Sequence, residues 1–214
     1  MNTMIANGII GVLVLTLVYL ILAGRLVTFI RVLSLQGFLL FGIVYFHLEN
    51  KMDLPNFIFI LVETILFKAI LVPYYLNNLI RKNGLSYERE PDQPSFYRIF
   101  IVLIILTLTF LFGSRLHTDS LRVIYITAAF STLLTGVLLA VKRTKLVTQI
   151  VGYLVVENGI FLLTLAVGHE MPVIINMIIL FDVITTIWLF GIFVSKVNFV
   201  FKSIETTKLT SLKD

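Results

Sequence analysis

The feature that most constrains the fold is a series of long apolar segments with short polar joints between them. A helix needs about 20 apolar residues to cross the hydrocarbon core of a bilayer. Segments of roughly this length run near 4–23, 26–47, 55–79, 97–113, 121–141, 146–167 and 172–194. Because the runs are continuous rather than alternating, each favours a helix, which satisfies its own backbone hydrogen bonds in lipid. We therefore expect an all-α integral membrane protein with seven transmembrane helices.

The composition excludes several classes of function. Only 14% of the residues are charged and 58% are hydrophobic, whereas about a quarter of a soluble domain is charged. The absence of cysteine excludes thiolate metal sites and iron–sulfur ligation on this chain. We expect no cofactor, metal or catalytic site here, so any redox centre belongs to a partner protein. The net charge of +5 does not indicate a nucleic-acid partner, because the basic residues lie at the ends of apolar segments.

The distribution of basic residues predicts how the chain crosses the membrane. On one side of the predicted spans, the only basic residues are Lys51, Arg115 and Arg122. Apart from Lys68, every other lysine and arginine lies towards the opposite side. The positive-inside rule places that basic side in the cytoplasm. We therefore predict an external N-terminus and a cytoplasmic C-terminus.

The second half of the sequence weakly repeats the first half. RLVTFIRVLSLQGFLL, residues 25–40, resembles KLVTQIVGYLVVENGIFLL, residues 145–163. Each copy is followed by a loop that ends in a proline, and then by an acid in mid-helix, Glu63 or Asp182. Because four spans separate equivalent helices, the two copies point the same way across the membrane. This pattern predicts two parallel three-helix repeats plus one extra helix.

The repeat also divides the chain. We predict a first three-helix repeat at 1–82, a cytoplasmic linker at 83–95, an extra helix with an outer loop at 96–120, a second repeat at 121–196 and a cytoplasmic tail at 197–214. The linker is charged and contains two prolines, which is typical of a surface segment between two halves.

Four ionisable residues lie well inside the predicted spans: Glu63, Lys68, Glu157 and Asp182. On an α-helix, residues 63 and 68 turn roughly 140° away from each other. We therefore expect Lys68 to face an acid on a neighbouring helix, Glu157 or Asp182, or an acid of another protein in a complex. Structural helix contacts are one interpretation, but Ser, Thr or Asn join helices at lower cost. Four charges at similar depth instead favour a proton or cation relay.

Three further residues carry expectations about packing. Pro73 is expected to kink the third helix and free carbonyl groups near Lys68. Asn158 is expected to hydrogen-bond a neighbouring helix, and Gly159 to permit close packing.

Three motifs carry a resemblance to a known family. VGYLVVENGIFLL (151–163), ILFDVITTIWLFGIF (179–193) and FKAILVPYYL (67–76) resemble component E of hydrogenase-4. That membrane protein is similar to the small K-type component of respiratory NADH:quinone oxidoreductase and to the corresponding small component of multisubunit cation/proton antiporters. The resemblance covers essentially the whole chain. It places Glu157 and Asp182 at the positions of the two glutamates of the K-type component, whereas Leu35 or Gln36 replaces the first of these acids in the first repeat.

The resemblance implies a non-catalytic membrane subunit of a proton- or cation-translocating complex related to group 4 nickel–iron hydrogenases and respiratory NADH dehydrogenase. Its expected partners are the lipid bilayer and antiporter-like and other membrane subunits, in a bacterial or archaeal cytoplasmic (inner) membrane. The alternative is a stand-alone small secondary transporter or a membrane scaffold. The small size of the chain and its incomplete duplication weigh against a lone transporter.

Overall fold

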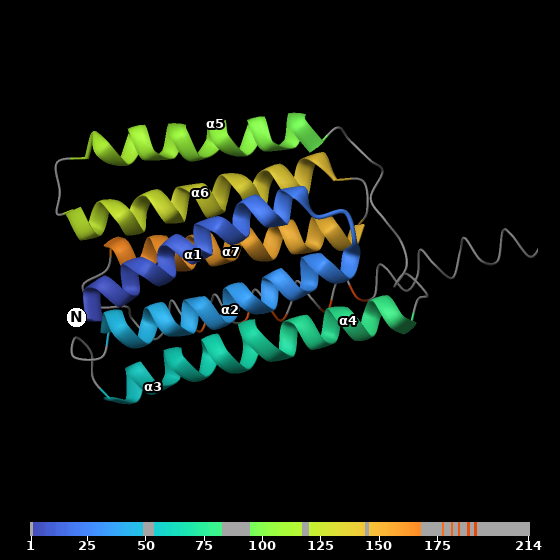
Figure 1. Ribbon diagram of the computed structural model, residues 1–214. Coiled ribbons are helices and arrows are strands. Elements are labelled where there is room, and N and C mark those ends of the chain that lie inside the picture. Colours follow the sequence, from blue (N-terminus) through green and yellow to red (C-terminus); the bar gives the residue numbers. More distant parts are fainter. Residues whose placement is uncertain are drawn as a thin grey trace, which may run out of the picture.

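The computed structural model describes residues 2–48, 54–82, 95–116, 120–143 and 146–167, together with positions 177, 181, 184, 188 and 191. The regular elements within these residues are all helical (Figure 1). They are α1 (Asn2–Leu22), α2 (Leu26–Leu48), α3 (Leu54–Val62), η1 (Glu63–Leu71), α4 (Val72–Lys82), α5 (Ser95–Ser114), α6 (Ser120–Lys142) and α7 (Leu146–Val167). The expected all-α class is thus confirmed for this part of the chain.

Five stretches are long and apolar enough to cross a membrane. They are Met4–Leu22, Leu26–Phe46, Phe57–Arg81, Arg122–Lys142 and Val147–Val167. The fourth predicted span forms α5, whose apolar part, Ile99–Ser114, is shorter. The seventh predicted span, 172–194, lies largely outside the described residues, so the count of seven and the three-helix repeats stay predictions. The outer surface is rich in exposed large apolar side chains such as Leu108 and Phe110, as expected of helices in lipid.

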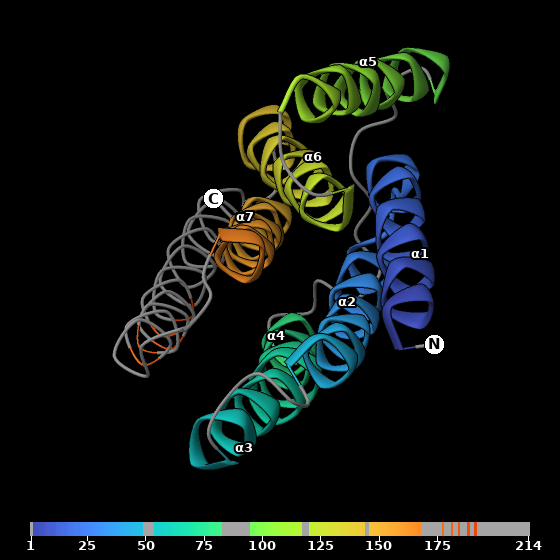
Figure 2. The ribbon, with the colours of Figure 1, turned by 90° about the vertical axis from the view of Figure 1, so that its left-hand side faces the viewer.

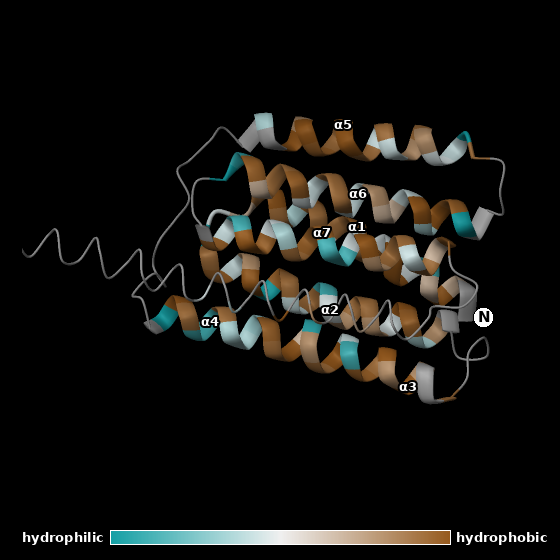
Figure 3. Cartoon of the chain, turned by 180° about the vertical axis from the view of Figure 1, so that it is seen from behind, coloured by the Kyte–Doolittle hydropathy of each residue, from teal (hydrophilic) through white to brown (hydrophobic). Residues whose placement is uncertain are grey.

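The helices lie roughly alongside one another, with α5 and the α3–α4 helix at opposite edges (Figures 1 and 2). The most extensive helix contact is that of α6 with α7, followed by those of α1 with α2 and of α2 with η1. Figure 3 shows that α1, α2, α5, α6 and α7 are mostly apolar, whereas α4 has many hydrophilic positions. Hydrophilic positions also occur in the middle of α2 and α7 and of the continuous helix that contains η1. Two apolar clusters fill the interior. One contains Phe29, Ile80 and Val151, and the other contains Ile43 and Phe161.

The third predicted span is one continuous helix that changes its winding in the middle. The segment η1 is π-helical, and the N–H of Val72 donates to the carbonyl of Phe67, five residues earlier. Pro73 follows directly. Proline has no backbone N–H to donate, and in a regular α-helix its ring would clash with the carbonyl oxygen four residues earlier. That carbonyl belongs to Ala69, and it accepts a hydrogen bond of 2.6 Å from Ser34 Oγ on α2. This bond supports the expectation that Pro73 frees a carbonyl near Lys68, whereas the expected kink stays a prediction.

Glycines on α6 and α7 allow the two backbones to touch. A Cβ added at Gly136 would lie 2.6 Å from the backbone nitrogen of Val156, and one at Gly152 would lie 2.5 Å from that of Ala140. A Cβ added at Gly159 would lie 2.8 Å from the backbone nitrogen of Leu133, which confirms the expected role of Gly159 in close packing. Small residues at such spacings are the usual means by which helices approach one another in lipid.

Arg143, just after α6, fixes the end of α1. Its Nη2 donates to the carbonyls of Ile21 at 2.8 Å and Ala23 at 3.1 Å, and its guanidinium lies 5.2 Å from the centre of the Phe29 ring. The last carbonyls of a helix lack intrahelical donors, and a cation at that end also complements the helix dipole. Sequence reasoning treated Arg143 only as a topological charge.

Candidate functional site

A buried polar layer separates the two apolar clusters. On each contributing helix its members lie between the residues of the two clusters in sequence. The buried members are Thr16 on α1, Gln36 on α2, Glu63, Thr64 and Lys68 on η1, Ser131, Thr132 and Thr135 on α6, and Glu157 and Asn158 on α7. The layer therefore crosses the bundle near the middle of its helices. It brings together three of the four charged residues predicted as a relay.

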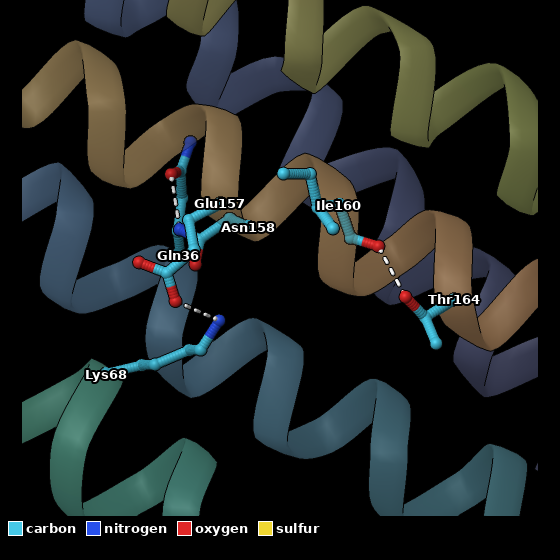
Figure 4. Close-up of polar contacts among 6 residues, drawn as sticks. All are labelled: Gln36, Lys68, Glu157, Asn158, Ile160 and Thr164. Atoms are coloured by element: carbon cyan, nitrogen blue, oxygen red, sulfur yellow. Dashed lines mark hydrogen bonds and ion pairs between the residues drawn. The ribbon is translucent and has the colours of Figure 1, made fainter. Parts of the chain in front are cut away.

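Lys68 and Glu157 form the centre of this layer. Lys68 Nζ lies 3.1 Å from Glu157 Oε1, and each side chain is only 6% exposed (Figure 4). The ammonium also lies 4.7 Å from the centre of the Phe161 ring, one turn further along α7. The prediction that Lys68 faces an acid on a neighbouring helix is confirmed, and that acid is Glu157. Asp182, the other candidate, lies outside the described residues.

Glu63 lies beside this pair and is 2% exposed. It is close enough to interact electrostatically with both Lys68 and Glu157, yet neither of its carboxylate oxygens accepts a hydrogen bond from a described residue. The predicted 140° separation of residues 63 and 68 is wrong, because both lie in the π-helical segment and not in an α-helix. In a π-helix the hydrogen-bonded partners are five residues apart, so residues at that spacing lie near one face.

A chain of hydrogen bonds starts at Asn158, next to Glu157 in sequence, and crosses the bundle. Asn158 Nδ2 donates to Gln36 Oε1 at 3.3 Å, and Gln36 Nε2 donates to Thr16 Oγ1 at 3.0 Å. Thr16 Oγ1 in turn donates to the carbonyl of Leu13 at 2.6 Å. These bonds connect α7, α2 and α1, and they confirm the expected interhelical hydrogen bond of Asn158.

The position of Lys68 is held by the close approach of α2 to η1. A Cβ added at Gly37 would lie 2.6 Å from both the Cα and the nitrogen of Ala69, and 2.7 Å from the carbonyl carbon of Lys68. Ser34, one turn before Gly37, binds the carbonyl of Ala69. Sequence reasoning missed Ser34, Gly37 and Thr16 as supporting residues. Their signal was weak, since single Ser, Gly and Thr residues are common in membrane helices.

The described part of the site has little free space and no group of side chains that could hold a metal ion. A cavity of about 10 Å³ is lined by Lys68, Glu157, Asn158 and three apolar residues, which is close to the minimum volume that holds one water molecule. Within the described residues no group of three His, Cys, Asp or Glu side chains is placed to hold a metal ion. The chemistry available among the described residues is therefore that of two carboxylates and one ammonium, beside a cavity of about the size of one water molecule.

Comparisons with models of known protein families, with curated proteins and with solved structures gave no match for this chain.

Proposed function

We propose that this chain is a non-catalytic membrane subunit of a proton- or cation-translocating complex, and that it supplies Glu63, Lys68, Glu157 and Asp182 to an intramembrane relay. The observation that carries the proposal is the buried Lys68–Glu157 ion pair with Glu63 beside it. Charges at the centre of a bilayer cost about 3 kcal/mol each even on the lowest scales. Replacing a buried ion pair by apolar residues is often neutral or stabilising, so helix packing alone does not explain its presence.

The composition of the charge cluster suits proton transfer. With both acids ionised and Lys68 protonated, the cluster carries one net negative charge, so a single bound proton makes it neutral. That proton can reside on Glu63 while Glu157 pairs with Lys68, which corresponds to the observed geometry. It can equally reside on Glu157 while the flexible ammonium of Lys68 turns to Glu63. These two states have the same net charge and differ in the position of the proton, which is the requirement for a relay.

The wider assignment follows the resemblance described above. We propose that the chain is related to component E of hydrogenase-4, with seven spans in two parallel repeats, an external N-terminus and a cytoplasmic C-terminus. Antiporter-like subunits and a redox module would be separate chains in a bacterial or archaeal cytoplasmic membrane. The lack of cysteine supports this division, because the chain has no thiolate to ligate a metal centre.

One observation favours the alternative of a membrane scaffold. The cavity beside the ion pair has a volume of only about 10 Å³, about enough for one water molecule, whereas a relay needs a path along which ions reach the pair. A scaffold needs no such path. The two functions differ in what they require of Glu157: a relay requires a titratable acid, whereas a scaffold requires only a polar contact of the right length.

The test is ion pumping by the assembled complex in vesicles, normalised to the amount of this protein. Glu157→Gln keeps the length and hydrogen-bonding capacity but removes the titratable charge, so a relay loses coupled translocation while the complex still assembles. Glu157→Asp keeps the acid and should retain more pumping than Glu157→Gln. A scaffold gives the reverse ranking. Pumping at the wild-type level by the Gln variant would remove Glu157 as an obligatory relay residue.

A further inference from the structure

A groove of about 390 Å³ runs along the outside of the bundle between α2 and the helix formed by η1 and α4. It is separate from the charge layer, whose ion pair does not line it. Its walls are largely apolar and include Val27, Phe38 and Ile70. The volume falls in the range of small-molecule sites, which is about 300–1,000 Å³.

The groove exists because small side chains meet where α2 crosses η1. Ser34 on α2 and Ala69 and Pro73 on the other helix all line it. The hydroxyl of Ser34 donates to the carbonyl of Ala69 at 2.6 Å, so the two helices are tied together at this level. The depression is therefore a fixed feature of the helix contact.

Two arginines mark one end of this groove. Arg31 lies five residues after the start of α2, and Arg81 lies one residue before the end of α4. Both line the groove and both are exposed. Neither forms an ion pair with an acid among the described residues. Two cations with no acidic partner among the described residues therefore stand at the predicted cytoplasmic end of an apolar groove.

We propose that this groove binds an anionic phospholipid, with its phosphate between Arg31 and Arg81 and an acyl chain along the apolar walls beside Ile70 and Phe38. Guanidinium groups bind phosphate oxygens through paired, charge-assisted hydrogen bonds. Basic pockets between transmembrane helices on the cytoplasmic side are typical sites for anionic headgroups. The inference depends only on the helix arrangement and on a membrane location, and it is independent of the proposed relay.

A second groove provides an internal comparison. It lies between α1 and α2, has a volume of about 380 Å³ and is lined by Tyr19, Thr28 and Arg31. Among the described residues that line it, Arg31 is the only basic one, so it lacks the second cation that would hold a phosphate from the other side. We therefore assign the lipid to the groove between α2 and the η1–α4 helix, which Arg81 lines. The groove between α1 and α2, which Tyr19 lines, serves as a control.

The first experiment measures headgroup selectivity. The full chain, in the assembly with which it is extracted, is equilibrated with vesicles of phosphatidylcholine and phosphatidylglycerol in equal parts, and retained lipids are counted by native mass spectrometry. The ratio of phosphatidylglycerol to phosphatidylcholine should fall roughly fivefold for Arg31→Gln and again for Arg81→Gln. Arg25→Gln is the matched control, because Arg25 is exposed at the same end of α2 and does not line the groove.

An unchanged ratio in the Arg31→Gln/Arg81→Gln double variant would overturn the proposal, and so would an equal loss in Arg25→Gln. All three arginines are exposed, so the folded state should survive each substitution, and identical elution in size-exclusion chromatography checks this.

The second experiment identifies the occupant directly. With p-benzoylphenylalanine in place of Tyr74, which lines the groove and is 70% exposed, irradiation should give an adduct with the mass of an anionic phospholipid. The same replacement at Tyr19 should give less of that adduct. The crosslink at position 74 could instead join a protein segment, such as residues 83–94 of this chain, which include three acidic residues, or another protein of the assembly. In that case the groove is a protein contact and the lipid proposal is wrong.

Discussion

Two helix contacts in this bundle are made by different means. One joins α6 to α7, and the other joins η1 to α2 and α7. On α6 and α7, glycines bring the backbones together, so that a Cβ at Gly152 would lie 2.5 Å from the backbone nitrogen of Ala140. In the charge layer, Lys68 on η1 reaches Glu157 on α7 at 3.1 Å. Both contacts lie inside the same bundle. The first contains no charge, whereas the second concentrates the buried charges of the described residues.

The difference shows that charge is not required for helix association in this chain. Lipid tails are as apolar as the helices, so helices associate through close packing and polar contacts rather than a hydrophobic force. The α2–η1 contact already has such packing, because a Cβ at Gly37 would lie 2.6 Å from Ala69 Cα. The ion pair joins η1 to α7, and it is therefore added to a bundle in which Gly37 and the Ser34 hydrogen bond already hold η1 against α2. That surplus is the main support for a functional role of the charges.

The largest expected effect comes from breaking the ion pair on one side only. Lys68→Met removes the buried ammonium beside Glu63 and Glu157, and removal of one partner of a buried pair typically costs about 3–5 kcal/mol. The double variant Lys68→Met/Glu157→Leu should recover much of this loss, because neither buried charge of the pair remains. Unfolding free energies in mixed detergent micelles measure both effects. The relay proposal adds that the double variant, although stable, does not support ion translocation.

If Lys68→Met is as stable as the wild type, Lys68 is not held as a buried ion in the folded protein. Wild-type translocation by the stable double variant would instead assign the pair to packing, as on α6 and α7.

The next effect tests the uncharged contact. Gly152→Ala places a methyl group against the backbone of α6, where neither element can yield without moving the helices apart. Overpacking of this kind costs about 1–3 kcal/mol. Gly11→Ala on α1 is the matched control, since a Cβ there meets nothing within 4 Å. The control should be neutral or slightly stabilising because alanine favours the helix. Equal stability of the two variants would contradict the packing described for α6 and α7.

A smaller effect is expected at the end of the bundle. Arg143→Gln removes the charged donor that binds the carbonyls of Ile21 and Ala23. A cation at a partly buried helix C-terminus contributes up to about 2 kcal/mol. We expect a loss of about 1–2 kcal/mol in unfolding free energy, whereas Arg25→Gln, which removes an exposed charge nearby, should have little effect. A loss in both variants would indicate that net charge, and not the carbonyl contacts, is responsible.

The length and continuity of the apolar segments predicted much of this architecture. The second span was expected at 26–47 and is observed as Leu26–Leu48, and the sixth span, expected at 146–167, is observed as Leu146–Val167. These agreements arise because bilayer thickness alone sets the length of an apolar run. The cost of buried charge likewise identified Glu63, Lys68 and Glu157 as special before their contacts were known.

The arrangement within the charge layer could not be predicted in the same way. The choice of Glu157 over Asp182 as the partner of Lys68 depends on how helices pack, which a single sequence does not encode locally. The π-helical winding of η1 also changed the direction of Glu63 relative to Lys68. Pro73 indicated a disturbance, but the compensating hydroxyl of Ser34 comes from a different helix, 35 residues away from Ala69 in sequence. Contacts between helices therefore determine how these side chains are arranged, and α-helical periodicity alone does not predict that arrangement.

The smallest expected effect separates the two kinds of polar contact within the charge layer. Asn158 and Gln36 join α7 to α2 through one hydrogen bond of 3.3 Å. A double-mutant cycle of Asn158→Leu and Gln36→Leu should give a coupling free energy of about 0.6 kcal/mol, the average for such bonds between membrane helices. Amide groups do not titrate, so these residues can hold helices but cannot store a proton.

Gln36→Leu should therefore lower the amount of folded protein slightly while leaving translocation, normalised to that amount, near the wild-type level. Glu157→Gln, next to Asn158 on the same helix, should do the opposite by preserving assembly and abolishing coupling. If both variants lower normalised translocation equally, the function of the layer lies in its shape and hydrogen bonding. If only the loss of the acid does so, the ion pair has a role that the amide contact beside it does not share.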